Sequence, residues 1–77
     1  MAEIINVLTD REALVFIGAK NIRFIESKFW GAGLQPSGQG WPVKQLCKVY
    51  DVDQHLAAER LNKFITAGRI AGPLLMR

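Results

Sequence analysis

Residues 41–77, WPVKQLCKVYDVDQHLAAERLNKFITAGRIAGPLLMR, decide the fold that we expect for this chain. Within them, the apolar residues that recur at helical spacing are Ala57, Leu61, Phe64 and Ile65. This pattern predicts a helix over residues 57–67 with one face for a core and one polar face. Gly68 follows where a left-handed residue commonly ends a helix. Residues 69–77 then predict an extended segment, and Pro73 makes it an edge strand or a wing because proline cannot donate to a ladder.

A shorter helix is predicted upstream, over residues 42–50. Pro42 lies at its first turn, where a missing N–H costs little. Apolar residues follow at three- and four-residue steps: Val43, Leu46, Cys47 and Tyr50. Between the two helices, Asp51 and Asp53 each offer an oxygen to the free N–H groups of a helix start. The order of helix, turn, helix, glycine and strand predicts a mostly α chain with a small winged helix-turn-helix-like domain over residues 41–77.

Three pieces of this region resemble a known family: WPVKQLC, HLAAERLNKF and AGRIAGPLLMR. They share a proline one residue into the first piece, the pair His55-Leu56 opening the second helix, and A-G-x-I-x-x-P closing it. In these features residues 41–77 resemble the excisionase-like, MerR-type helix-turn-helix group, and within it the pyocin transcriptional activator family of phage-derived regulators. The resemblance covers about half of the chain. It implies a phage- or prophage-type DNA-binding transcriptional regulator or an excisionase-like factor.

Ahead of this region we expect an added N-terminal helix over residues 9–29. Thr9, with Glu12 three residues later, has the pattern of a capping box. The inward stripe of this helix is expected to comprise Leu14, Ile17 or Gly18, Ile22, Ile25 and Phe29. Gly18 weakens the middle of the helix by about 1 kcal/mol relative to alanine. Either a close helix contact therefore requires this glycine or the helix breaks there.

A second apolar side of this region is formed by residues that lie off that stripe: Val15, Phe16, Phe24 and Trp30. We interpret them as contacts for a second copy of the chain or for another protein. Residues 30–40, WGAGLQPSGQG, predict a glycine-rich loop. The two tryptophans that bracket it, Trp30 and Trp41, either anchor a binding partner or seal the edges of the core.

The first residues of the chain predict a short strand at residues 3–8, EIINVL. Its natural partner is the segment 70–76, and the pair would form a short two-stranded β-element from the two termini. The alternative is a frayed N-terminus.

Length and composition indicate one small domain spanning residues 1–77. With 49% hydrophobic and 22% charged residues, the chain is ordinary globular material. A core of this size is marginal, so we expect a homodimer. One cysteine, Cys47, excludes an internal disulfide and favours a reduced thiol in the cytoplasm. The longest apolar run, residues 13–19, is far shorter than the roughly 20 residues that span a bilayer, so no membrane partner is expected.

No set of residues in the sequence has the pattern of a catalytic or metal site. The single histidine, His55, and the single cysteine are too few for structural zinc. His55 and Glu59 are four residues apart and predict a pair at a helix start rather than an acid–base site. We therefore expect a non-enzyme with no cofactor and no small-molecule substrate.

Charge is unevenly distributed: residues 1–40 sum to zero, and residues 41–77 carry the whole net charge of +3. The first functional hypothesis is therefore double-stranded DNA binding, with helix 57–67 in the major groove. Asn62 and Lys63 would reach base edges there. Flanking positions are Glu59, Arg60 and Thr66, and phosphate contacts are Lys44, Lys48, Arg69 and Arg77. The alternative hypothesis is a phage-type inhibitor or adaptor that occupies a host protein, for example a transcription or defence component.

Overall fold

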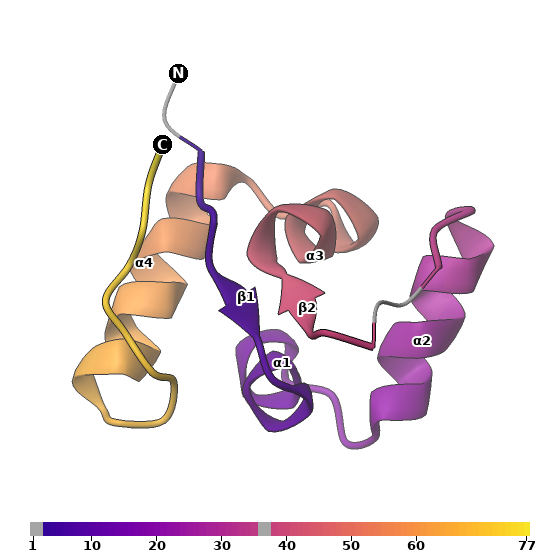
Figure 1. Ribbon diagram of the computed structural model, residues 1–77, viewed down its shortest axis with the longest axis horizontal. Coiled ribbons are helices and arrows are strands. Elements are labelled where there is room, and N and C mark those ends of the chain that lie inside the picture. Colours follow the sequence, from indigo (N-terminus) through magenta and orange to yellow (C-terminus); the bar gives the residue numbers. More distant parts are fainter. Residues whose placement is uncertain (1–2, 36–37) are drawn as a thin grey trace.

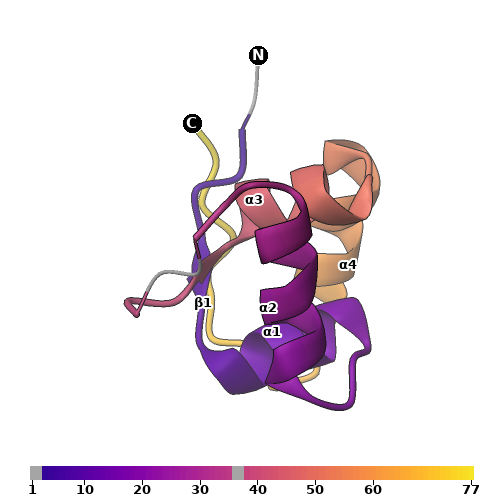
Figure 2. The same cartoon turned by 90° about the vertical axis from the view of Figure 1, so that its right-hand side faces the viewer.

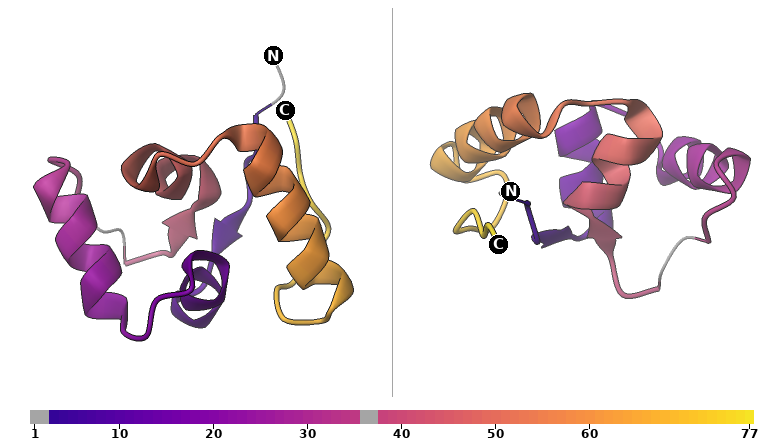
Figure 3. Two further views of the ribbon diagram at one scale, coloured as in Figure 1. Left: turned by 180° about the vertical axis from the view of Figure 1, so that it is seen from behind. Right: turned by 90° about the horizontal axis from the view of Figure 1, so that it is seen from above.

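The described part of the chain folds as four helices and a two-stranded antiparallel sheet (Figure 1). The computed structural model describes residues 3–35 and 38–77. The elements, in chain order, are β1 (Val7–Leu8), α1 (Asp10–Ile17), α2 (Ile22–Gly31), β2 (Trp41–Pro42), α3 (Val43–Tyr50) and α4 (Gln54–Thr66). Figures 2 and 3 show the strands and the C-terminal segment in one layer, with the helices packed on one side of it. None of the helices in these described ranges is both long enough and apolar enough to cross a membrane.

Helix α1 begins with the predicted capping box. The Thr9 Oγ1 accepts a hydrogen bond from the Glu12 N–H (3.2 Å), and the Glu12 Oε1 accepts one from the Thr9 N–H (3.0 Å). The expectation of one helix over residues 9–29 is wrong, because α1 ends at Gly18, where φ is +80°. A Cβ at Gly18 would meet nothing within 4 Å, so the glycine allows a helix break rather than a close contact. Helix α2 then starts after Asn21, whose side chain caps it.

The sheet pairs two segments whose pairing was not predicted from the sequence. β1 runs antiparallel to β2, with Val7 opposite Pro42 and Leu8 opposite Trp41. The expected pairing of the two termini is also present, as a single bridge between Ile4 and Met76 flanked by backbone hydrogen bonds. Residues 3–8 are therefore held on both sides, by β2 and by the C-terminal segment, and the alternative of a frayed terminus does not apply to them.

Alternation along the N-terminal strand directs Ile4 and Leu8 into the core and leaves Ile5 and Val7 exposed. Ile25 and Phe29 of the expected inward stripe are buried, whereas Leu14, Ile17 and Ile22 are only half-buried. On α1 their places in the core are taken by Ala13 and Phe16. Phe16 is 1% exposed, so its assignment to a protein contact is wrong. The break at Gly18 explains the difference, because each short helix turns its own face inward.

The loop predicted at residues 30–40 starts later than expected, because α2 continues through Gly31. Its residues 36–37 lie outside the described part of the chain. The two tryptophans have different environments: Trp30 is 58% exposed, whereas Trp41 is 3% exposed. The Trp41 ring packs edge-on against Phe29 (centroids 5.0 Å apart), and its Nε1–H donates to the Asp10 Oδ1 at 2.6 Å. Trp41 is thus a core residue, and only Trp30 remains accessible to a partner.

Two side chains fasten the C-terminal segment to the rest of the fold. The buried Asn6 donates through Nδ2 to the Pro73 carbonyl (2.9 Å) and accepts through Oδ1 from the Leu75 N–H (2.7 Å). The Glu12 Oε2 accepts from the Ala71 N–H at 2.7 Å. Burial favours a higher pKa for the Glu12 carboxyl, but the hydrogen bonds from backbone N–H groups outweigh it and lower that pKa.

Candidate nucleic-acid interface

Helices α3 and α4 are joined by the three-residue turn 51–53. Asp51 ends α3 in a left-handed conformation (φ +54°). Asp53 occupies the N-cap of α4, although its side chain makes no capping hydrogen bond. Because of this position α4 begins at Gln54, three residues before the predicted start. The predicted glycine stop is confirmed: α4 ends at Thr66, and Gly68 has φ +74°.

Packing fixes which side of α4 faces outward. Leu46 and Cys47 of α3 and Ala57 and Leu61 of α4 belong to the same buried core. The opposite side of α4 is exposed, and its exposed residues are His55, Leu56, Glu59, Asn62, Lys63 and Thr66. Gln54, His55 and Leu56 were not among the predicted site residues. Recognising Asp53 as the N-cap would have started the predicted helix at Gln54 and so included these residues in it.

Most of the predicted base-reading residues lie on this exposed side. Asn62 and Lys63 are exposed, as are the flanking Glu59 and Thr66. Arg60 differs: it is half-buried, and its guanidinium donates to the Phe16 carbonyl (3.2 Å) and lies over the Phe16 ring at 5.4 Å. Arg60 therefore braces α4 against α1 and does not face outward with the other four.

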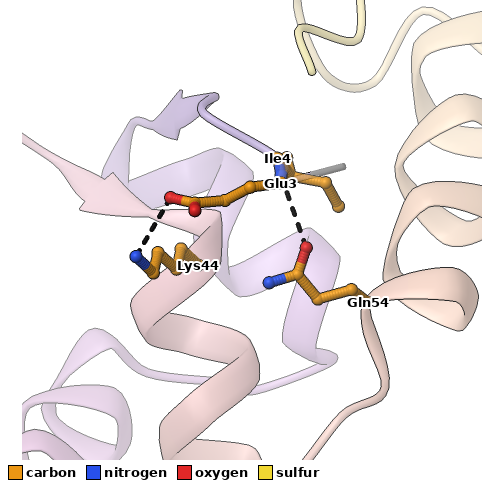
Figure 4. A network of polar contacts seen from close by, with 4 residues as sticks. All are labelled: Glu3, Ile4, Lys44 and Gln54. Carbon is orange, nitrogen blue, oxygen red and sulfur yellow. Dashed lines mark hydrogen bonds and ion pairs between the residues drawn. The ribbon is translucent and has the colours of Figure 1, made fainter. Parts of the chain in front are cut away.

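The lysines proposed to hold phosphates project from α3. Lys44 and Lys48 are exposed and one helical turn apart. The Lys44 Nζ already forms an ion pair with the Glu3 Oε1 at 3.0 Å (Figure 4). Beside it, the Gln54 Oε1 accepts a hydrogen bond from the Ile4 N–H at 3.4 Å. The N-terminal residues are thus connected to the start of both helices.

A groove of about 370 Å³ lies between α3 and the first residue of α4, lined by Lys44, Cys47, Lys48, Asp51, Val52 and Gln54. Two of these residues are cations, and Cys47 adds no charge at neutral pH. Burial raises the pKa of the Cys47 thiol, which keeps it protonated. The groove therefore combines two ammonium groups with one carboxylate.

The remaining predicted phosphate contacts lie toward opposite ends of α4. Arg69 follows the C-terminal end of α4, and its guanidinium lies 5.6 Å from the Phe64 ring centroid. Arg77 pairs through its backbone with Glu3, whose side chain forms the ion pair with Lys44. The structure therefore brings Arg77 close to the Lys44 end of the surface and separates Arg69 from it.

The residues proposed as protein contacts are dispersed. Phe24 and Trp30 are 61% and 58% exposed on α2, whereas Val15 is half-buried. Another open groove, of about 510 Å³, lies between α2 and α3 and is lined by Ser27, Lys28, Gly31, Ala32 and Val49. Among residues 3–35 and 38–77, no three His, Cys, Asp or Glu residues are grouped to hold a metal ion. Comparison of the chain with protein-family models, curated proteins and solved structures found no match.

Proposed function

We propose that this chain binds double-stranded DNA with the exposed side of α4 in the major groove. The observation that carries the proposal is this outward polar side, on a helix that follows α3 after a three-residue turn. Helix-turn-helix domains present their second helix in this way. The proposed role is that of a phage- or prophage-type transcriptional regulator or excisionase-like factor, and it is supported by the resemblance of residues 41–77 to the pyocin activator family.

The dimensions of α4 suit such a contact. Its 13 residues give a rod about 20 Å long, and the B-DNA major groove is about 12 Å wide. Asn62 is suited to the donor and acceptor pair of adenine, and Lys63 to the two acceptors of guanine. The exposed Lys48, and Lys44 once released from Glu3, would approach phosphates from α3. Glu59 suits the exocyclic amine of cytosine, so an acidic residue in the middle of the helix is compatible with base reading.

Two copies on adjacent half-sites are part of the proposal, because one copy offers few contacts. Half-sites that face the same side of the duplex are about 34–36 Å apart. The longest principal extent of the described residues is 30 Å, which is less than that spacing and therefore compatible with two copies side by side. A homodimer or a paired arrangement on DNA would double the number of phosphate contacts.

Fluorescence anisotropy with a labelled random-sequence duplex, at low and moderate salt, tests the proposal. We expect salt-sensitive binding by the wild type. On a second duplex that carries a site selected with the wild type, the Asn62→Ala/Lys63→Ala variant should bind at least about tenfold more weakly and lose its preference over the random duplex, since a base contact contributes about 1–3 kcal/mol. Lys20→Ala is the matched control for charge, because Lys20 is exposed in the turn between α1 and α2.

Circular dichroism of each variant must match the wild type before binding is compared. Absence of binding at low salt would refute the proposed function. Equal loss of affinity in the Lys20→Ala control and in the α4 variant would refute the assignment of α4 as the reading helix.

A further inference from the structure

Helix α2 lies at the edge of the molecule, on the far side of α1 and α3 from α4 (Figures 1 and 3). One side of it is buried through Ile25 and Phe29. The exposed cationic and aromatic residues of this helix and of the turn before it are here named the α2 surface: Lys20, Arg23, Phe24, Lys28 and Trp30. The proposed DNA contact uses none of them.

Two large aromatic side chains on this surface lack a covering element. Phe24 is 61% exposed and Trp30 58% exposed, although Ile25 and Phe29 of the same helix are completely buried. Leaving large aromatic rings in water forgoes the free energy that their burial would supply. Tryptophan is also the residue type most enriched among the energetic centres of protein interfaces. The pair therefore indicates a contact surface.

Charge on the α2 surface has one sign. Lys20, Arg23 and Lys28 are exposed, whereas the one carboxylate of this helix, Glu26, is half-buried. The Lys28 ammonium lies 5.6 Å from the Tyr50 ring centroid and is thereby placed at the boundary of α2 and α3. A partner that covers the aromatic rings would lie beside these cations, so a partner with acidic side chains is favoured.

The groove of about 510 Å³ between α2 and α3 supplies a place for an apolar side chain. Gly31, Ala32 and Val49 line it with small and apolar groups, and Lys28 and Ser27 complete it. Phe24 lies three residues before Ser27 and four before Lys28 on α2, so one exposed aromatic ring is on the side of the helix that lines the groove. A side chain anchored there would leave its neighbours within reach of the three cations.

We propose that the α2 surface and this groove dock an acidic segment of another protein, anchored by one large apolar side chain. The proposal is independent of DNA binding by α4 and adds a second partner. A nucleic acid suits the groove less well, because only Ser27 and Lys28 among its lining side chains offer polar atoms to a base. A second copy is disfavoured because its acidic, apolar segment around Leu56 and Glu59 belongs to α4, and such head-to-tail contacts would form rings or open chains rather than the two-fold homodimer that we expect.

The test starts with a random 12-residue peptide library displayed on phage and selected against the immobilised chain. The Phe24→Ala/Trp30→Ala variant serves as the counter-target, since both side chains are mostly exposed and their removal leaves the core intact. The most enriched peptide is synthesised with a fluorescent label, and its affinity is measured by anisotropy. Leu56→Ala is the matched control, because Leu56 is 57% exposed on α4. Binding of a labelled single-stranded dT15 oligonucleotide is measured in the same way, and sedimentation of the chain alone measures its self-association.

We expect the selected peptides to be net negative and to contain a large apolar residue. Their affinity should fall at least about tenfold in Phe24→Ala/Trp30→Ala and in Arg23→Glu/Lys28→Glu, and stay unchanged in Leu56→Ala. Three results would overturn the proposal: no enrichment or enrichment of neutral or basic peptides, dT15 binding that the same variants abolish, and self-association that Leu56→Ala abolishes. The binding of the α2 variants to the DNA duplex is measured separately, so that failure of this proposal can be distinguished from failure of the proposed function.

Discussion

Replacing Asn6 by alanine should destabilise the fold by about 2 kcal/mol. Asn6 is 8% exposed, and its side chain joins the N-terminal strand to the C-terminal segment through bonds to Pro73 (2.9 Å) and Leu75 (2.7 Å). Each intramolecular hydrogen bond contributes about 0.5–1.5 kcal/mol net, so two bonds give about 1–3 kcal/mol. The backbone bond from the Val43 N–H to the Asn6 carbonyl (2.9 Å) is unaffected by the substitution. For a chain of this size, the loss corresponds to a fall in Tm of about 8–16 °C.

Urea denaturation followed by circular dichroism measures this loss, with Asn62→Ala as the control. The control makes the same chemical change at an exposed position of α4, and we expect less than about 0.5 kcal/mol from it. Asn6→Asp is a second test, because a carboxylate oxygen would face the Pro73 carbonyl at neutral pH. Protonation of that aspartate restores a donor, so its stability relative to wild type should improve as the pH falls. A loss below about 0.5 kcal/mol in Asn6→Ala would refute the reasoning.

Three further outcomes follow from single contacts. Gly40→Ala should cost about 2 kcal/mol in urea denaturation, because a Cβ would lie 2.8 Å from a β1 side-chain carbon and 2.9 Å from a β1 carbonyl oxygen, at φ +119°; Gly38→Ala, with open space around it, should cost little. Glu12→Gln should make the free energy of unfolding less dependent on pH in the acid range. The folded state lowers the pKa of Glu12, so the stabilisation by its carboxylate is present above the usual value of 4.5 and is lost as the pH falls through the folded-state pKa. An unchanged loss of stability in acid would contradict this role. Glu3→Gln should raise duplex affinity by up to about fivefold by freeing Lys44 from its ion pair, an effect that must vanish in a Lys44→Ala background.

Local sequence signals predicted the parts of the fold that are encoded by neighbouring residues. The Thr9–Glu12 capping box, the helix after Pro42 and the glycine stop at Gly68 each depend on residues within a few positions of one another. Gly18 was ambiguous, because apolar residues on both sides of it concealed the change of face between α1 and α2. Only the space around Gly18, which is open, distinguishes a helix break from a close packing contact.

The sequence patterns did not predict the pairings between residues that are far apart in the chain. β1 and β2 contain two residues each, too few to show any periodicity, and 32 residues separate Leu8 from its partner Trp41. The role of Arg60 was missed for a related reason, since its partner is the Phe16 carbonyl on another helix. Its position between the inner and outer sides of α4 was compatible with either direction. For the candidate site, spacing predicted four of the exposed residues of α4, Glu59, Asn62, Lys63 and Thr66, but not His55 and Leu56, nor which cations have partners within the chain.

The pairing of cations within the chain sets the salt dependence expected for DNA binding. Lys44 is paired with Glu3, and Arg60 is engaged with α1. The exposed cations left on residues 41–77 are Lys48, Lys63, Arg69 and Arg77. Lys63 is assigned to a base edge, so Lys48, Arg69 and Arg77 remain as phosphate contacts, and three contacts at about 0.9 each limit one copy to a slope of about −2.7 in log affinity against log salt. A duplex with two half-sites should double the slope to about −5.4, because two copies release two sets of counterions. The same slope on duplexes with one and with two half-sites would contradict the paired arrangement, whereas a slope near zero would contradict phosphate binding by these three side chains.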